Sequence, residues 1–99
     1  MEKLALLATV HAKPGKEKEV EEFLKSAQPL AEAETGTIAW YAFSLGGGRF
    51  GIFDTFADEA GRQAHLTGDI AKALMAKAPE LFGVPPVIEK PAILAVKSR

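Results

Sequence analysis

Three consecutive glycines, Gly46-Gly47-Gly48, separate two short apolar segments, and this feature constrains the fold of the chain more than any other. The flanking segments, residues 37–44 (TIAWYAFS) and 49–56 (RFGIFDTF), are rich in aromatic and β-branched residues, which favour strands. Glycine tolerates the positive φ angles of a tight hairpin turn. The sequence therefore predicts an antiparallel β-hairpin in the middle of the chain.

Helical patterns and further strands flank this hairpin on both sides. Asp58 is a plausible N-cap, Pro29 is expected to kink or split the first helix, and Pro91 suggests that the last strand is an edge strand or carries a bulge. The predicted elements in chain order are a strand over 3–13, a helix over 16–34, strands over 37–44 and 49–56, a helix from 58 to about 66, a helix over 70–82 and a strand over 87–97.

This β-α-β-β-α-β order predicts the fold class. Two hairpin-linked strands flanked by a βα unit and an αβ unit make the ferredoxin-like arrangement, an α+β fold with a four-stranded antiparallel sheet and the helices on one face. A chain of 99 residues is the size of one domain, so we expect residues 1–99 to form a single unit.

Both faces of the predicted sheet are apolar, which suggests a partner. A half-exposed antiparallel sheet normally shows one polar face. In the second strand, however, Ile38, Trp40 and Ala42 alternate with Ala39, Tyr41 and Phe43. A second copy of the chain is the simplest cover for the open face, so we predict a homodimer packed sheet to sheet, with Tyr41 and Phe43 in its core.

Composition excludes several classes of function. There is no cysteine, so a disulfide framework and a thiolate metal site are excluded, and His11 and His65 lack metal-ligand spacing. The net charge of −1 and the absence of a basic patch disfavour nucleic acid. No apolar run is long enough to span a membrane, and no signal peptide is evident, so we expect a cytoplasmic location.

Asp54 and His65 are the residues that most suggest chemistry. If the hairpin folds about Gly47, Trp40 lies opposite Asp54, and the indole N–H and the carboxylate are a donor and an acceptor that could meet. His65 follows in the next helix and is the obvious donor to a buried Asp54. The pair is either a general base or acid, His65, oriented by the Asp54 carboxylate or, with Trp40, a satisfied structural cluster that fixes helix to sheet.

Three segments carry a resemblance to a known family: KPGKEKEVEEFL (13–24), EAETGTIAWYAF (32–43) and FDTFADEAGRQAHL (53–66). With them the chain resembles the antibiotic biosynthesis monooxygenase (ABM) domain family of the dimeric α/β-barrel superfamily. That family commonly has a carboxylate, one residue, then Trp at the end of the third strand, and a helix with His. Here Phe56 replaces the Trp, and the absence of Asn argues against the set used by haem-degrading relatives.

The resemblance implies a dimeric α/β barrel and a cofactor-independent monooxygenase that oxidises a small aromatic or quinol with dioxygen, without metal, flavin or haem. It implies a cavity between sheet and helices, with His65 and Asp54 as catalytic residues and Trp40 and Phe56 as substrate-binding residues. Two alternatives remain: a non-catalytic dimeric module that binds a small molecule, and a purely structural polar cluster with no cavity.

Overall fold

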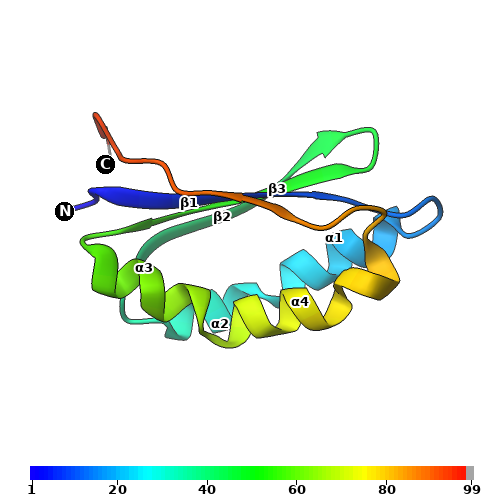
Figure 1. The fold of residues 1–99 in the computed structure, drawn as a ribbon, viewed down its shortest axis with the longest axis horizontal. Coiled ribbons are helices and arrows are strands. Elements are labelled where there is room, and N and C mark those ends of the chain that lie inside the picture. Colours follow the sequence, from blue (N-terminus) through cyan, green and yellow to red (C-terminus); the bar gives the residue numbers. More distant parts are fainter. Residues whose placement is uncertain (98–99) are drawn as a thin grey trace.

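In the part of the chain that the structure describes, a four-stranded antiparallel sheet carries every helix on one face and none on the other (Figure 1). The structure is a computed structural model, and it describes residues 1–97. The strand order is β2-β3-β1-β4. The elements are β1 (Leu4–His11), α1 (Glu17–Ser26), α2 (Gln28–Ala33), β2 (Thr37–Gly46), β3 (Arg49–Phe56), α3 (Glu59–Leu66), α4 (Asp69–Leu81) and β4 (Val87–Glu89). The predicted ferredoxin-like α+β fold is confirmed, and the sheet is open, with β2 and β4 at its edges.

The helix boundaries follow local sequence signals. The first helical segment is split into α1 and α2 at Ala27, and Pro29 lies in the first turn of α2, where its missing N–H is not needed. At the start of α3 the Asp58 side chain accepts a hydrogen bond from the Gly61 N–H at 2.9 Å. Both predictions, the break near Pro29 and the cap at Asp58, are confirmed.

The last strand is much shorter than predicted. Pairing of β4 with β1 covers only Val87–Glu89, so the expected strand over 87–97 is wrong for most of its length. Pro91 has no N–H to donate to the ladder, which explains the interruption. The chain nevertheless stays beside β1, since the Ala5 N–H donates to the Pro91 carbonyl at 3.0 Å and the Ile93 N–H to the Lys3 carbonyl at 2.8 Å.

The hairpin register is the one that the glycines predict. Gly46, Gly47 and Gly48 all have positive φ, and Trp40 pairs with Asp54 across the two strands. Because alternate residues of a strand point to opposite faces, Trp40 and Asp54 share the inner face with the helices. The register thereby places a carboxylate beneath the helical layer.

The core lies between the inner face of the sheet and the helices. It consists of one large group of buried residues, Val10, Val20, Leu24, Phe50, Ile52, Leu74, Leu81 and Phe82, and a small one, Ala27, Ala31 and Ile70. Trp40 packs against both groups from β2 and joins them. A side chain that bridges two parts of a core is well placed to form the wall of an adjoining cavity.

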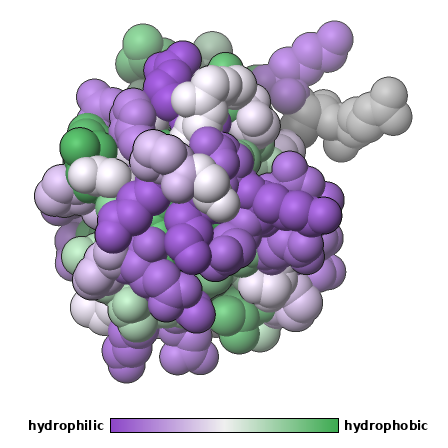
Figure 2. Space-filling view, turned by 90° about the vertical axis from the view of Figure 1, so that its right-hand side faces the viewer, coloured by the Kyte–Doolittle hydropathy of each residue, from purple (hydrophilic) through white to green (hydrophobic). Residues whose placement is uncertain are grey.

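The outer face of the sheet is apolar and uncovered. Tyr41 is 60% exposed and Phe43 is 36% exposed. The Phe43 ring lies over Gly51, where a Cβ atom would come within 3 Å of the ring. By contrast, hydrophilic side chains predominate at the end of the molecule where α1 begins and α4 ends (Figure 2). Within residues 1–97, none of the helices combines the length and the apolar character needed to cross a membrane.

Candidate functional site

His65 is held between two carboxylates. Its Nδ1 lies 2.6 Å from Glu34 Oε1, and its Nε2 lies 2.8 Å from Asp54 Oδ2. The three residues come from the end of α2, from β3 and from the last turn of α3. We call this arrangement the carboxylate clamp (Glu34, Asp54, His65). It ties the helical layer to the sheet at a point where His65 is only 8% exposed and Asp54 only 1%.

The clamp favours the charged imidazolium. Burial opposes the charge, but the contacts with Asp54 and then with Glu34 outweigh it and raise the pKa of His65 to about 9. At neutral pH the ring is therefore protonated: its Nδ1–H donates to Glu34, and its Nε2 lies at ion-pair distance from Asp54. A protonated imidazole is an acid and not a base, so the geometry favours proton donation or purely electrostatic holding by His65.

Glu34 is the member of the clamp that the sequence analysis missed. It follows α2 directly, and the Thr37 Oγ1–H also donates to its Oε1, at 2.7 Å. The sequence did offer one signal, because Glu34 is a carboxylate just before Gly36, where the helix is predicted to end. The exact position of that helix end, however, depends on the break between α1 and α2. Periodicity alone does not tell which way a side chain at a helix end turns.

The contact expected between Trp40 and Asp54 is not formed. The two residues are cross-strand partners, as predicted, yet the buried Trp40 Nε1–H finds no hydrogen-bond partner within residues 1–97. Asp54 Oδ2 contacts His65 at ion-pair distance but without the alignment of a hydrogen bond. Trp40 is thus a neighbour of the clamp and not part of it.

Phe56 lies against the clamp on the inner side. Its ring centroid is 5.6 Å from that of His65, and the side chain is fully buried. At this position the aromatic ring packs in the core beside the imidazole. Phe56 does not line the α1–β2 cavity described next, so its predicted contact with a substrate stays a prediction.

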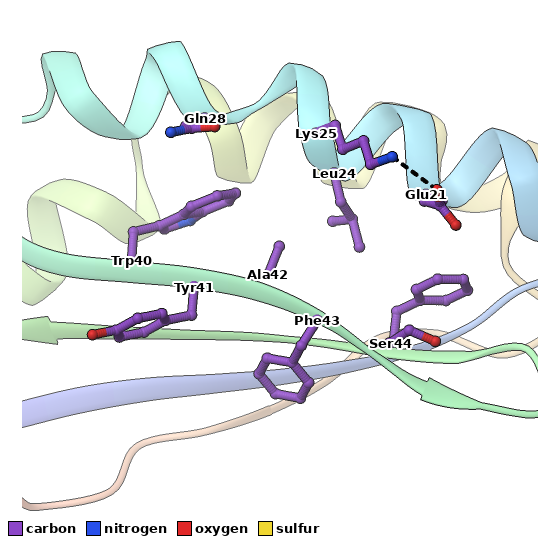
Figure 3. Close-up of a pocket in the computed structure, with 10 residues that line it drawn as sticks. Glu21, Leu24, Lys25, Gln28, Trp40, Tyr41, Ala42, Phe43 and Ser44 are labelled. Carbon is purple, nitrogen blue, oxygen red and sulfur yellow. Dashed lines mark hydrogen bonds and ion pairs between the residues drawn. The ribbon is translucent and has the colours of Figure 1, made fainter.

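A cavity of about 480 Å³ lies between α1 and β2. Figure 3 shows Leu24, Trp40 and Ala42 pointing into the space between helix and strand, with Glu21, Lys25 and Gln28 along the helical side. Tyr41 and Phe43 turn to the opposite face of β2 in the same view. The cavity has apolar walls and a few polar groups at its rim, which is the usual make-up of a small-molecule site.

The cavity and the clamp are separate features that meet at Trp40. Of the four predicted site residues, only Trp40 lines the α1–β2 cavity. His65 and Glu34 instead border a second hollow of about 350 Å³, between the end of α2 and the start of α4.

The clamp is not arranged as a metal site. Its two carboxylates contact opposite nitrogens of the imidazole, so the three groups do not converge on one point. In the part of the chain that the structure describes, no group of three or more His, Asp or Glu side chains could hold a metal ion.

Several solved structures are similar to this chain. The chain is similar to the protein NE2512 of Nitrosomonas europaea, of unknown function, at 57% identity over 100% of this chain and 96% of that one, with a TM-score of 0.97. Two other solved structures share the fold. Rv0793 of Mycobacterium tuberculosis is 20% identical over 97% of this chain and 99% of that one, with a TM-score of 0.84. A Caulobacter crescentus protein with the provisional name antibiotic biosynthesis monooxygenase is 22% identical over 95% of this chain and 92% of that one, with a TM-score of 0.79.

A comparison with curated proteins gives no match. The family model described as antibiotic biosynthesis monooxygenase matches residues 4–77, from the first residue of β1 into α4. This match spans most of the chain and includes all three members of the clamp as well as Trp40. The chain therefore belongs to the antibiotic biosynthesis monooxygenase family.

Proposed function

We propose that the protein is a cofactor-independent monooxygenase that oxidises a small aromatic or quinol with dioxygen in the α1–β2 cavity. The observation that carries this proposal is the cavity itself, about 480 Å³ in volume and walled by Leu24, Trp40 and Phe50, in a chain of the antibiotic biosynthesis monooxygenase family. A volume of this size suits a ligand of one to three fused rings.

The proposed chemistry needs little from the protein. An electron-rich phenol loses a proton, the phenolate passes one electron to dioxygen, and the two radicals recombine. One oxygen atom is retained in the product and the other leaves as water. An apolar wall that excludes water, together with a positive group near the ligand oxygen, favours the first step. The α1–β2 cavity has apolar walls and carries Lys25 at its rim.

In this proposal the His65–Asp54 pair acts as a proton donor and positioning unit behind the cavity wall. His65 is charged at neutral pH because of its two carboxylate partners, and Asp54 is the cross-strand neighbour of Trp40. The pair thereby supports β3 beside the strand that carries Trp40, and its imidazolium is the proposed proton donor to a reduced oxygen species. Trp40 serves as cavity wall, while Phe56 supports the imidazole from the core.

The proposal includes a homodimer that closes the barrel sheet to sheet. Tyr41 and Phe43 form an exposed aromatic patch on the bare face of the sheet, and large exposed apolar patches mark interaction sites. Because this patch is on β2, which also forms one wall of the cavity, a partner would stiffen that wall.

Oxygen uptake by metal-free protein on a panel of quinols, anthrones and flavonols tests the proposal. The expected result is uptake that depends on protein, with one quinone or ketone formed per dioxygen consumed, and at least a tenfold loss in His65→Ala. Uptake that persists unchanged in His65→Ala would assign the clamp a structural role only.

A second candidate function is a dimeric module that binds a small aromatic molecule without oxidising it. The observation that favours it is the separation of His65 from the α1–β2 cavity. It predicts saturable binding of the same panel compounds and no oxygen consumption. Uptake together with product formation would rule it out.

A further inference from the structure

The polar groups of the α1–β2 cavity gather at its rim. Carboxylate, ammonium and amide groups of Glu21, Lys25 and Gln28 project from the helical side, and the Ser44 hydroxyl lies on the strand side (Figure 3). The remaining wall is apolar. A ligand that fits such a site has one polar edge and a flat apolar body, as a phenol does.

Lys25 lies at this rim and retains hydrogen-bonding capacity. Its Nζ donates to Glu21 Oε2 at 2.9 Å, one turn earlier on α1, and both side chains are largely exposed. The hydrogen bond and the charge of Glu21 raise the pKa of Lys25, so the ammonium stays charged. An ammonium group has three donors, so Lys25 can hold Glu21 and a ligand oxygen at once.

The other cationic side chains that the structure describes near the helices do not line the α1–β2 cavity. Among the lining residues described for this cavity, Lys25 is the single positive group. Arg62 is buried and donates to Glu59 and to the Ala5 carbonyl, and His65 is enclosed by the clamp. Lys16, at the start of α1, pairs with Glu19 and does not line the cavity.

We propose that Lys25 holds the oxygen of the ligand as a phenolate at the rim of the α1–β2 cavity. This inference rests on the proposed function and assigns the first step to a residue outside the carboxylate clamp. In that step the phenol O–H bond breaks, its electron pair stays on the oxygen, and the proton goes to water. The ligand class is a phenol whose flat body lies against Trp40, Leu24 and Phe50 while its oxygen faces the ammonium.

Two optical signals separate binding from ionisation. Trp40 is the only tryptophan in the chain and lines the cavity, so quenching of its fluorescence reports occupancy. The probe is 4-nitrophenol, whose phenolate absorbs visible light while the neutral phenol does not. Titration of the bound probe with acid then gives its pKa directly, and quenching is corrected for absorption by the probe.

The expected result is saturable quenching and a pKa of bound 4-nitrophenol about one unit below that of the free probe, a tenfold rise in the ratio of phenolate to phenol. Lys25→Met should abolish the shift while retaining weaker quenching. Lys16→Met, which removes one charge and one ion pair from the same helix, should keep the shift. Glu21→Gln should enlarge the shift, because it removes the competing carboxylate.

The outcomes are distinguishable. Quenching with an unshifted probe pKa, or a shift that survives Lys25→Met, would overturn the role of Lys25 and leave a ligand site in the cavity intact. No quenching by 4-nitrophenol up to millimolar concentration would overturn this inference together with the proposed use of the cavity. Circular dichroism of each variant identifies any loss of Lys25-dependent signal that comes from unfolding.

Discussion

His65 Nδ1 and Glu34 Oε1 lie 2.6 Å apart although the two residues are separated by 31 positions in the chain. This contact connects the end of α2 to the last turn of α3, and the opposite side of the same ring contacts Asp54 on β3. An imidazolium between two carboxylates is a strong local constraint on how the helices sit above the sheet.

Glu34→Gln should weaken the clamp while keeping its shape. The amide oxygen still accepts from His65, but half of the negative charge around the ring is gone, so the pKa of His65 should fall below about 9 and stability near neutral pH should drop by about 1 kcal/mol. Imidazole NMR titration and urea unfolding measure the two effects. Glu32→Gln, an exposed neighbour on α2, is the matched control and should change neither.

The clamp makes stability depend on pH on the alkaline side of neutrality. The folded pKa of His65, about 9, is raised above the value of 6.5 for a free imidazole, so the stabilisation is fully present below about pH 6.5 and is lost as pH rises towards 9. The shift corresponds to about 3 kcal/mol, which solvent screening reduces to on the order of 2 kcal/mol.

Urea unfolding at intervals from pH 6 to 9.5 measures this loss. His65→Gln should flatten the curve in that window, whereas His11→Gln, on the sheet and outside the clamp, should leave it unchanged. A wild-type stability that stays level between pH 6.5 and 9 would show that the imidazolium is not held by Glu34 and Asp54.

The aromatic patch on the bare face of the sheet should form the dimer contact. Phe43→Lys places a charge there and should shift the protein towards a monomer of 10.6 kDa in sedimentation velocity at micromolar concentration. Met75→Lys, at a position that is 57% exposed but lies on α4 in the helical layer, should leave the dimer unchanged. Wild-type protein that sediments as a monomer would contradict the sheet-to-sheet assembly.

Gly51 allows the Phe43 ring to lie close over the sheet. A Cβ atom at position 51 would clash with the tip of that ring, and the ring can swing outward at little cost because it is exposed. Gly51→Ala should therefore weaken self-association by about tenfold while the secondary structure seen by circular dichroism stays intact. Equal dissociation constants for Gly51→Ala and wild type would contradict a packing role for the ring.

Local sequence signals predicted the hairpin, its register and the helix break, because glycine, proline and alternating apolar residues act within a few positions of the structure they specify. The register of Trp40 with Asp54 follows directly from the turn at Gly47. The length of the last strand did not follow, since Pro91 both interrupts the ladder and lets the chain stay beside β1 through its carbonyl.

The candidate site was predictable only in part, because local sequence signals do not report contacts between distant parts of the chain. The proximity of Asp54 and His65 could be inferred from one strand and the next helix, but Glu34 enters from a helix end far away in the chain. The α1–β2 cavity depends on how far α1 stands from β2, a distance set by packing that periodicity does not encode. Lys25 lies at the rim of the cavity, but the sequence pattern alone predicts that it belongs to a solvated helix face.

The central claim is that the α1–β2 cavity is the place where an aromatic substrate meets dioxygen. The most direct measurement is oxygen uptake on the best compound of the panel by wild type, by Ala42→Phe, which fills the cavity, and by Ala76→Phe, an exposed site on α4 that lines no described cavity. The account predicts at least a tenfold loss of kcat/KM in Ala42→Phe and none in Ala76→Phe. Equal uptake by all three proteins, each shown to be folded, would contradict it.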